Sequence, residues 1–282
     1  MKHVWFLLFW GVVYYSGLNA IYILLSKKRL TLLGYHSISN VSNKAVLQND
    51  VYKHLSVPVA VFEQQLVFLR KRNYTFLRFS DLRDIREGKC SLPRRAVLVY
   101  FDDGYKDNYI NAYPILKRLG IPATIFVVTD CLDKKKILWD ADFSPADARI
   151  FLSWEELRIM RDVFDIGSHT VTHRKLTELR ADEVREECMQ SHRRITEMTG
   201  TEPVAFSYPK SRWTPDIRRV VGETGFEFIL AHGRGFHHSA NFRYLEKIPV
   251  GPEDTMLVFG LKLGVYYPLM NMLQYGATIR RA

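Results

Sequence analysis

Residues 96–105 read Ala-Val-Leu-Val-Tyr-Phe-Asp-Asp-Gly-Tyr. The first six positions are apolar or aromatic without a break, which is typical of a strand that is buried on both faces of a sheet. Two adjacent carboxylates, Asp102 and Asp103, follow this strand directly and precede Gly104. Because Asp-Asp-Gly also forms ordinary turns, the stretch alone predicts a covered parallel sheet and gives only a modest indication of a functional site.

Strands and helices alternate on both sides of this strand. The residue pattern predicts further strands at 30–35, 75–79, 123–128, 164–167, 203–207 and 226–231, and helices at 61–70, 108–119, 153–161, 182–198 and 215–223. Ser80 and Ser153 are expected to cap helices, and Gly200 to end one. This alternation predicts parallel βαβ units in a sheet or barrel. No linker or internal repeat divides the chain, so one domain is expected.

Two histidines follow another predicted strand end, in Ile166-Gly167-Ser168-His169-Thr170-Val171-Thr172-His173. Residues four apart share one face of a helical turn, so both imidazoles are expected to reach a single metal ion. The carboxyl ends of parallel strands meet at one edge of a sheet. An aspartate from another strand end would therefore complete a three-ligand metal site with an open position for water.

A third polar motif, Phe206-Ser207-Tyr208-Pro209-Lys210-Ser211, ends a further predicted strand. A proline-fixed turn of this kind can direct a backbone N–H at a reaction centre. Taken alone, the motif is equally consistent with a loop that leads to the next helix.

The composition limits the classes of protein to be considered. The chain has 282 residues, of which 47% are hydrophobic and 25% charged, so it is globular and neither disordered nor fibrous. Three widely spaced cysteines argue against a disulfide scaffold and favour reduced thiols, with a single bridge as the alternative. The net charge of +10 suits an acidic partner. No basic run exceeds three residues and no nucleic-acid motif is present, so nucleic acid is not expected as a partner.

The amino terminus is expected to be a membrane segment. The 22 residues from Val4 to Leu25 carry no charge, and as a helix they would be about 33 Å long, against about 30 Å of bilayer hydrocarbon. We expect an uncleaved single-pass anchor in the bacterial inner membrane, with a cleaved signal peptide as the alternative. Lys27, Lys28 and Arg29 follow the segment, so the positive-inside rule favours a cytoplasmic domain, with the periplasmic side as the alternative.

Together the three motifs resemble the polysaccharide deacetylases, the NodB-homology domain of carbohydrate esterase family 4. The resemblance runs from about Leu30 to the carboxyl terminus and includes the flanking stretches 33–38, 121–127 and 152–157. It implies an α/β fold, a distorted (β/α) barrel of about seven strands, here preceded by one N-terminal transmembrane helix. Residues 1–28 would be the anchor or signal peptide with its basic flank, and residues 29–282 the catalytic domain.

By this resemblance, Asp103, His169 and His173 would bind one divalent metal ion, with zinc favoured and cobalt, nickel or iron as alternatives. Asp102 would be the catalytic base, and the backbone N–H of Lys210 would stabilise the oxyanion.

Two positions depart from the family pattern. Ser207 stands where the family usually has an arginine that orients the catalytic aspartate. The family's late Leu-x-His motif, which supplies an acid, is matched here by Leu245-Glu246-Lys247, so Lys247 is the candidate acid. His36, His232, His237 and His238 are alternatives between which the sequence does not choose.

We therefore expect a metal-dependent deacetylase that acts on an N-acetylated amino sugar, either in a polysaccharide or linked to polyprenyl phosphate. The altered motifs leave a catalytically weak saccharide-binding relative as the alternative. Membrane lipids are expected as further partners.

The apolar stretch 256–277 includes Lys262 and Pro268, so it is expected to pack on the domain, with a face that rests on the membrane surface, and not to span the membrane.

Overall fold

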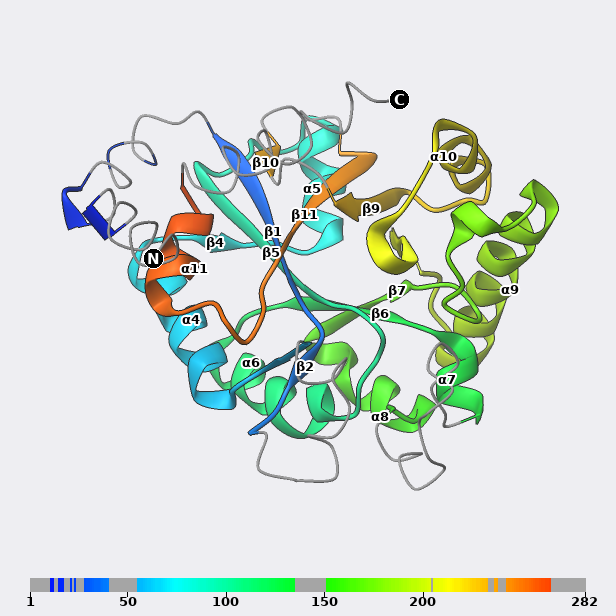
Figure 1. Ribbon diagram of the computed structural model, residues 1–282, viewed down its shortest axis with the longest axis horizontal. Coiled ribbons are helices and arrows are strands. Elements are labelled where there is room, and N and C mark those ends of the chain that lie inside the picture. The colour runs from blue at the N-terminus through cyan, green and yellow to red at the C-terminus, as the bar shows by residue number, and fades with distance from the viewer. Residues whose placement is uncertain are drawn as a thin grey trace, which may run out of the picture.

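Seven parallel strands close into a barrel in the computed structural model (Figure 1). The structure describes residues 11–12, 15–17, 21, 23, 28–40, 55–134, 151–203, 205–232, 236–237 and 242–264. Around the barrel, each strand pairs with the next and the last returns to the first: β1 (Arg29–Tyr35), β5 (Arg95–Phe101), β6 (Ala123–Val127), β7 (Phe164–Ser168), β8 (Ala205–Ser207), β9 (Phe228–His232) and β11 (Tyr244–Pro249).

Four short strands lie outside this ring. β4 (Thr75–Phe76) extends the sheet beside β5, β10 (Phe236–His237) pairs antiparallel with β1, and β2 (Ser37–Ile38) pairs with β3 (Ser56–Val57). The predicted barrel of about seven strands is confirmed. One of its strands differs from the prediction, because β11 belongs to the barrel and the predicted strand at 75–79 does not. The predicted strand 75–79 stops early because Phe79 already begins a helix. β11 was missed because Glu246 and Lys247 interrupt its apolar pattern.

Helices cover the outside of the barrel (Figure 1). Ser153 caps one of them as predicted, since its side chain accepts the N–H of Glu156, and Gly200 ends another with a left-handed φ of 69°. Ser80 is not a cap, because its helix begins one residue earlier, after Arg78. The helices are α4 (Val59–Lys71), α5 (Phe79–Arg86), η2 (Asn108–Ala112), α6 (Tyr113–Leu119), α7 (Thr129–Lys134), α8 (Trp154–Ile159), η4 (Met160–Asp162), η5 (Leu176–Glu178), α9 (Ala181–Thr199), η6 (Pro209–Ser211), α10 (Pro215–Gly222) and α11 (Met256–Lys262).

Alternate side chains of the strands form an apolar cluster with α5. Phe79 at the start of α5 packs against Phe126 and Phe228, with ring centroids 6.3 and 5.0 Å away. Tyr100 belongs to the same cluster and requires a glycine beside it: a Cβ on Gly34 would lie 1.9 Å from the Tyr100 hydroxyl. This cluster fills the barrel, so chemistry is left to the ends of the strands.

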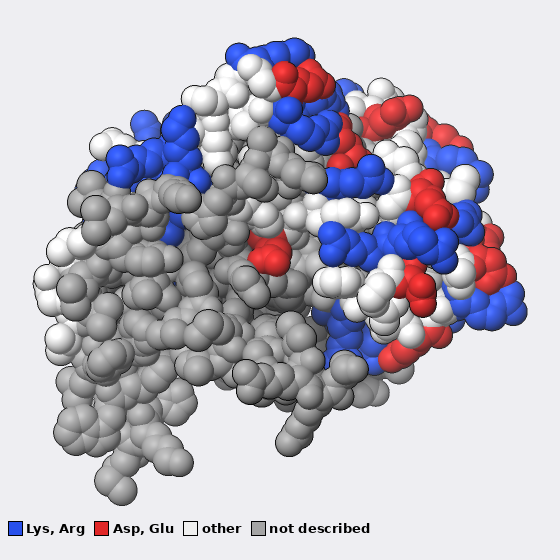
Figure 2. Space-filling model, turned by 90° about the horizontal axis from the view of Figure 1, so that it is seen from above, with Lys and Arg blue, Asp and Glu red and all other residues white. Residues whose placement is uncertain are grey.

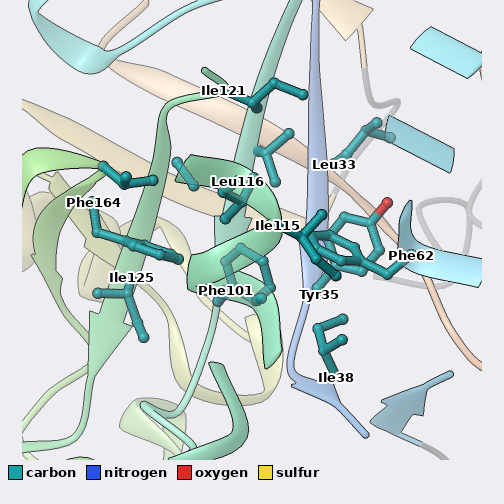
Figure 3. Packing of buried hydrophobic residues seen from close by; sticks show 14 of the residues in the cluster. Leu33, Tyr35, Ile38, Phe62, Phe101, Ile115, Leu116, Ile121, Ile125 and Phe164 are labelled. Atoms are coloured by element: carbon teal, nitrogen blue, oxygen red, sulfur yellow. The ribbon is translucent and has the colours of Figure 1, made fainter. Parts of the chain in front are cut away.

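The opposite faces of the strands pack against the helices (Figure 3). Tyr35 stacks on Phe101 at 5.6 Å and meets the edge of Phe62 from α4 at 5.1 Å. The Tyr35 hydroxyl donates to Gln65 Oε1 at 2.9 Å, which satisfies this buried polar group. β1 and β5 are thereby held firmly at the end from which Asp102 and Asp103 emerge.

The carboxyl-terminal helix α11 packs on α4, where Phe259 meets Phe68 at 6.1 Å. The prediction that the stretch 256–277 packs on the domain is confirmed as far as Gly264; the remainder lies outside the described residues. The predicted membrane segment at 4–25 also lies largely outside them. No helix within the described residues is both long enough and apolar enough to cross a bilayer.

Candidate active site

Polar side chains from four strands meet at the carboxyl end of the barrel. Asp102 and Asp103 follow β5, His169 follows β7, Ser207 ends β8, and Lys247 lies on β11. All five residues are buried, with relative exposures of 4% or less. Buried charges and imidazoles need partners in such a place, and the contacts between them define the site.

Asp103, His169 and His173 form a possible three-ligand metal site. The Nε2 atoms of both histidines lie 3.4 Å from Asp103 Oδ1. This is longer than a typical N–H···O hydrogen bond, but it equals the separation of about 3.4 Å between two tetrahedral ligands that each lie about 2.1 Å from a zinc ion. Asp103 Oδ1 accepts no hydrogen bond from the described part of the chain. A buried carboxylate oxygen in this state fits a cation.

The ionisation of these groups agrees with metal binding. Burial opposes the charge on Asp103, but the neighbouring histidines outweigh it and hold the pKa of this carboxyl well below its usual range. Burial lowers the pKa of His173 to about 3, so its ring is neutral near pH 7, the form in which imidazole binds metals.

A hydrogen bond fixes the ring of His169. Its Nδ1 lies 2.6 Å from the carbonyl oxygen of Ser207, and since a carbonyl only accepts, Nδ1 carries the proton. The lone pair of Nε2 is then directed toward Asp103. Metal-binding histidines are usually oriented by such a bond from the second ring nitrogen.

The loop that carries the two histidines differs from the predicted helical turn. Thr170 and His173 have left-handed backbones, with φ of 71° and 59°, and no helix spans them. Both rings still reach Asp103 because the loop curls, not because a helix aligns them. The two histidines were predicted from their spacing and Asp103 from the family resemblance, but the predicted helical turn was wrong.

Glu187 on α9 holds this loop and was not predicted. Its carboxylate accepts the backbone N–H groups of Val171 and Thr172, each at 2.9 Å, and the hydroxyl of Thr172. Glu187 is 8% exposed on the buried face of α9. A glutamate among the apolar positions of an amphipathic helix was the available signal, because such a charge needs a buried partner.

Lys247 contacts Asp102 directly. Its ammonium donates to Asp102 Oδ2 at 3.0 Å and to Ser207 Oγ at 2.9 Å. Burial raises the pKa of Asp102, but Lys247 and nearby histidines outweigh it, so the pKa lies below its ordinary value. The cation that the family takes from an arginine at the position of Ser207 is present here as a lysine from another strand.

His36 also belongs to this site. It follows β1 directly, is half-buried, and its pKa is lowered by burial against the pull of Asp103 and Asp102. His237 lies beside Leu30 at the other end of β1, where its Nε2 accepts the N–H of Glu246. The side chains of His232 and His238 lie outside the described residues.

Lys210 lies at the rim of the site. Its φ is 53°, and its charge lowers the pKa of His173, which places it close to the histidine loop. The assignment of its backbone N–H as an oxyanion donor stays a prediction.

The fold and the site define a class of protein: a (β/α) barrel with a candidate metal centre at the carboxyl ends of its strands, where barrel enzymes have their active sites. Residues 89–229, half of the chain, match the family described as polysaccharide deacetylase. The chain therefore belongs to the polysaccharide deacetylase family. This confirms the predicted family and the prediction of an enzyme, a hydrolase of carbon–nitrogen bonds other than peptide bonds.

Relatives and a solved structure agree with this assignment. YxkH of Bacillus subtilis, a polysaccharide deacetylase by name, is 28% identical over 234 residues, which cover 82% of this chain and 75% of that protein. The poly-beta-1,6-N-acetyl-D-glucosamine N-deacetylase of Staphylococcus aureus is 34% identical over 34% of this chain and 35% of its own length. The deacetylase PplD of Streptococcus pyogenes has the same fold, with a TM-score of 0.70 at 22% identity over 85% of this chain and all of that one.

Proposed function

We propose that this chain is a metal-dependent N-deacetylase that removes the acetyl group from an N-acetylated amino sugar in a polysaccharide. The observation that supports this best is the ionised Asp102 beside the triad of Asp103, His169 and His173. Asp102 is buried, is not one of the triad, and is paired with Lys247. A site that only bound saccharide would have no use for a base there, so the weak-binding alternative is disfavoured.

The triad would hold one divalent ion, with zinc favoured by the two imidazoles and one carboxylate. Such an ion supplies a bound water of lowered pKa and polarises the amide carbonyl. The contribution of the chain is orientation: Ser207 fixes the ring of His169, and Glu187 fixes the loop between the two histidines.

Asp102 would accept the proton of the attacking water. Lys247 keeps this carboxyl ionised and restricts its rotation by bonding Oδ2, which leaves Oδ1 to take the proton. We therefore propose Lys247 as the partner of the base and not as the acid. The backbone N–H of Lys210 would stabilise the negative oxygen that develops on the carbonyl carbon.

The departing nitrogen needs a proton when its bond to the acetyl carbon breaks. Of the two alternatives whose side chains are described, His36 interacts with Asp103 and Asp102, whereas His237 lies at the other end of β1. We propose that His36 delivers this proton. The overall reaction then consumes one water and gives acetate and the free amine of the sugar.

The relatives support a polymer as substrate. Two named relatives act on poly-beta-1,6-N-acetyl-D-glucosamine, although this chain spans only 20% and 35% of their lengths.

The chain itself would be attached to the membrane by residues 4–25. The positive-inside rule favours a cytoplasmic domain, and a polymer substrate favours the opposite side; a carboxyl-terminal reporter fusion distinguishes them.

Acetate release from N-acetylglucosamine oligomers tests the function. The full chain in detergent is expected to release acetate when loaded with zinc or cobalt, and to stop when a chelator removes the metal. Saccharide binding without acetate release in any metal-loaded sample would establish the binding-only alternative instead.

A further inference from the structure

The charge of the chain is concentrated in one segment. Residues 70–95 contain nine Lys and Arg against three Asp and Glu, so they provide +6 of the net charge of +10. Four of these cations have carboxylate partners: Arg78 pairs with Asp165, Arg83 and Arg86 with Glu227, and Lys89 with Asp84 and Glu87. Four more, Arg70, Lys71, Arg72 and Arg95, are called the basic cluster below.

The basic cluster lies at the amino ends of β1 and β5. Arg95 is the register partner of Arg29 at the first position of β1, and Arg95 Nη1 donates to the carbonyl oxygen of Arg72 at 2.6 Å. Arg70, Lys71 and Arg72 end α4 and are exposed. In Figure 2 a group of Lys and Arg lies at the left edge, on the side of α4 and β4, and no Asp or Glu of the described residues is seen beside it.

Local structure accounts for only part of this arrangement. The dipole of α4 favours Arg70 and Lys71 in its last turn. Arg95 approaches Arg72 through its hydrogen bond to the carbonyl oxygen at the end of α4, and Arg70 donates to the carbonyl oxygen of Leu119. Within the described residues, Arg70, Lys71, Arg72 and Arg95 form no ion pair. Like charges that gather without counter-charges are favourable where a polyanion neutralises them.

The proposed membrane segment would bring a membrane close to this cluster. The uncharged stretch ends at Leu25, and exposed Lys28 is three residues further on, next to Arg29. Arg29 is four residues after Leu25, a stretch of at most about 14 Å, so the end of the apolar stretch lies within about this distance of Arg29, the register partner of Arg95. Basic side chains within about 10 Å of a bilayer are attracted by anionic lipids.

We propose that the basic cluster rests on an anionic lipid surface and thereby orients the barrel, with its catalytic end facing away from the membrane. β1 runs from Arg29 beside the cluster to Tyr35, whose carbonyl oxygen accepts the N–H of Asp102 at 3.0 Å. Six residues of strand rise about 20 Å. Because barrel strands tilt by about 36° from the barrel axis, the catalytic centre lies about 16 Å along the barrel from the amino end of β1. A polymer reaches it, whereas the first sugar on a membrane-embedded polyprenyl phosphate does not.

Fluorescence quenching in vesicles tests this orientation. The full chain, with Cys90→Ser and a fluorophore on Lys71→Cys, is reconstituted in vesicles that contain headgroup-labelled quencher lipid. A second label on Ile110→Cys reports the catalytic end, where Ile110 is 58% exposed on η2. Quenching at position 71 should exceed that at position 110, and should be about threefold stronger with anionic phosphatidylglycerol than in neutral phosphatidylcholine vesicles.

Charge variants separate the cluster from the tether. The triple variant Arg70→Gln, Arg72→Gln and Arg95→Gln should reduce quenching in anionic vesicles to the level in neutral ones, and the corresponding lysine variant should retain it. Arg83→Gln, Arg86→Gln and Lys89→Gln remove three paired cations and serve as the matched control. Circular dichroism confirms that each variant is folded.

Several outcomes would overturn the proposal. These are equal quenching at positions 71 and 110, the same quenching in both kinds of vesicle, no association with vesicles, or a triple variant that loses only binding to double-stranded DNA. The inference rests on the proposed membrane attachment and not on deacetylation. A chain that released no acetate could still show the expected quenching, so the two proposals fail separately.

Discussion

Lys247 Nζ lies 3.0 Å from Asp102 Oδ2, although 145 positions separate the two residues in the chain. Their side chains are 2% and 4% exposed. Within a buried pair, removal of one partner leaves the other charge without compensation. The ionisation of Asp102 therefore depends on a residue that only the closed barrel brings to it.

Replacement of Lys247 should disturb the base more than the fold of the metal site. In Lys247→Met, burial of Asp102 is no longer opposed by the ammonium, so the pKa of Asp102 should rise. Ionised Asp102 would then require a higher pH, and the acidic limb of the kcat/KM profile should move upward. We expect about a 10²-fold loss of activity at neutral pH, with metal content retained. An unshifted acidic limb would remove Lys247 from this role.

A variant that moves the positive charge from position 247 to position 207 provides the control. In the double variant Ser207→Arg and Lys247→Ala, the arginine would stand at the position that the family uses. Activity should recover at least about tenfold relative to Lys247→Ala alone, and the acidic limb should return toward that of the unaltered chain. Failure to recover, in a folded and metal-loaded variant, would show that the direction of approach matters as well as the charge.

Asp102→Asn tests the base itself. The amide has the shape of the carboxylate but cannot accept the proton of water, so deacetylation should fall about 10²- to 10⁴-fold. Metal content by elemental analysis should be unchanged, because Asp102 does not belong to the triad. Near-normal turnover would exclude Asp102 from the mechanism.

Glu187→Gln tests the support of the histidine loop. The amide oxygen can still accept the N–H groups of Val171 and Thr172, which both bond Oε2, but without the negative charge these bonds are weaker, and the amide nitrogen cannot accept the Thr172 hydroxyl. The loop should therefore hold the histidines less firmly, and zinc affinity should fall about tenfold, measured by competition with a chelating dye. Glu186→Gln, on the exposed neighbour that accepts a hydrogen bond from Gln190 and makes no contact with the histidine loop among the described residues, is the matched control. Equal affinities in the two variants would argue against a role for Glu187.

His36→Gln separates delivery of the proton from attack. If His36 protonates the departing nitrogen, kcat should fall about 10²-fold, with little change in metal content. Substrates whose amine product is a weaker base should lose less of their kcat, because their nitrogen leaves more readily without protonation. A uniform loss for all substrates would instead indicate that His36 only binds or orients the sugar.

Gly34→Ala should destabilise the barrel through one clash. The added Cβ would meet the Tyr100 hydroxyl at 1.9 Å, and overpacking of this kind typically costs about 1–3 kcal/mol. Denaturant unfolding should show this loss of free energy. In a Tyr100→Leu background the same substitution should cost clearly less. An additive effect of the two changes would mean that the clash is relieved elsewhere.

Much of the site could be predicted from the sequence because its signals are local. A buried strand followed by Asp102 and Asp103, and two histidines four apart after another strand, are visible in short stretches. The shape of the histidine loop could not be predicted in this way. Thr170 and His173 have a left-handed φ in a loop whose backbone is hydrogen-bonded to Glu187 on α9. Spacing gives the number of ligands but not the backbone path between them.

The partner of Asp102 could not be predicted for a different reason. Lys247 was noted through a partial match to a motif, and was assigned as an acid on that basis. Its contact with Asp102 exists only because β11 closes the ring between β9 and β1. The strand itself was missed, since a buried lysine interrupts the apolar pattern that identifies strands. Lys247, the residue of β11 with the clearest functional contact, was therefore also the residue least typical of a strand.

The closing strand also determines how the parts of this enzyme can vary. The segment that matches the family, residues 89–229, contains the aspartates and both histidines. It contains neither β1 nor β11, and therefore neither His36 nor Lys247. The proposed metal ligands thus lie in one contiguous segment, whereas Lys247 and His36, the proposed partner of the base and the proposed proton donor, lie outside it. We therefore expect that relatives with the same metal ligands differ in optimal pH and in the amines they release where these two positions differ.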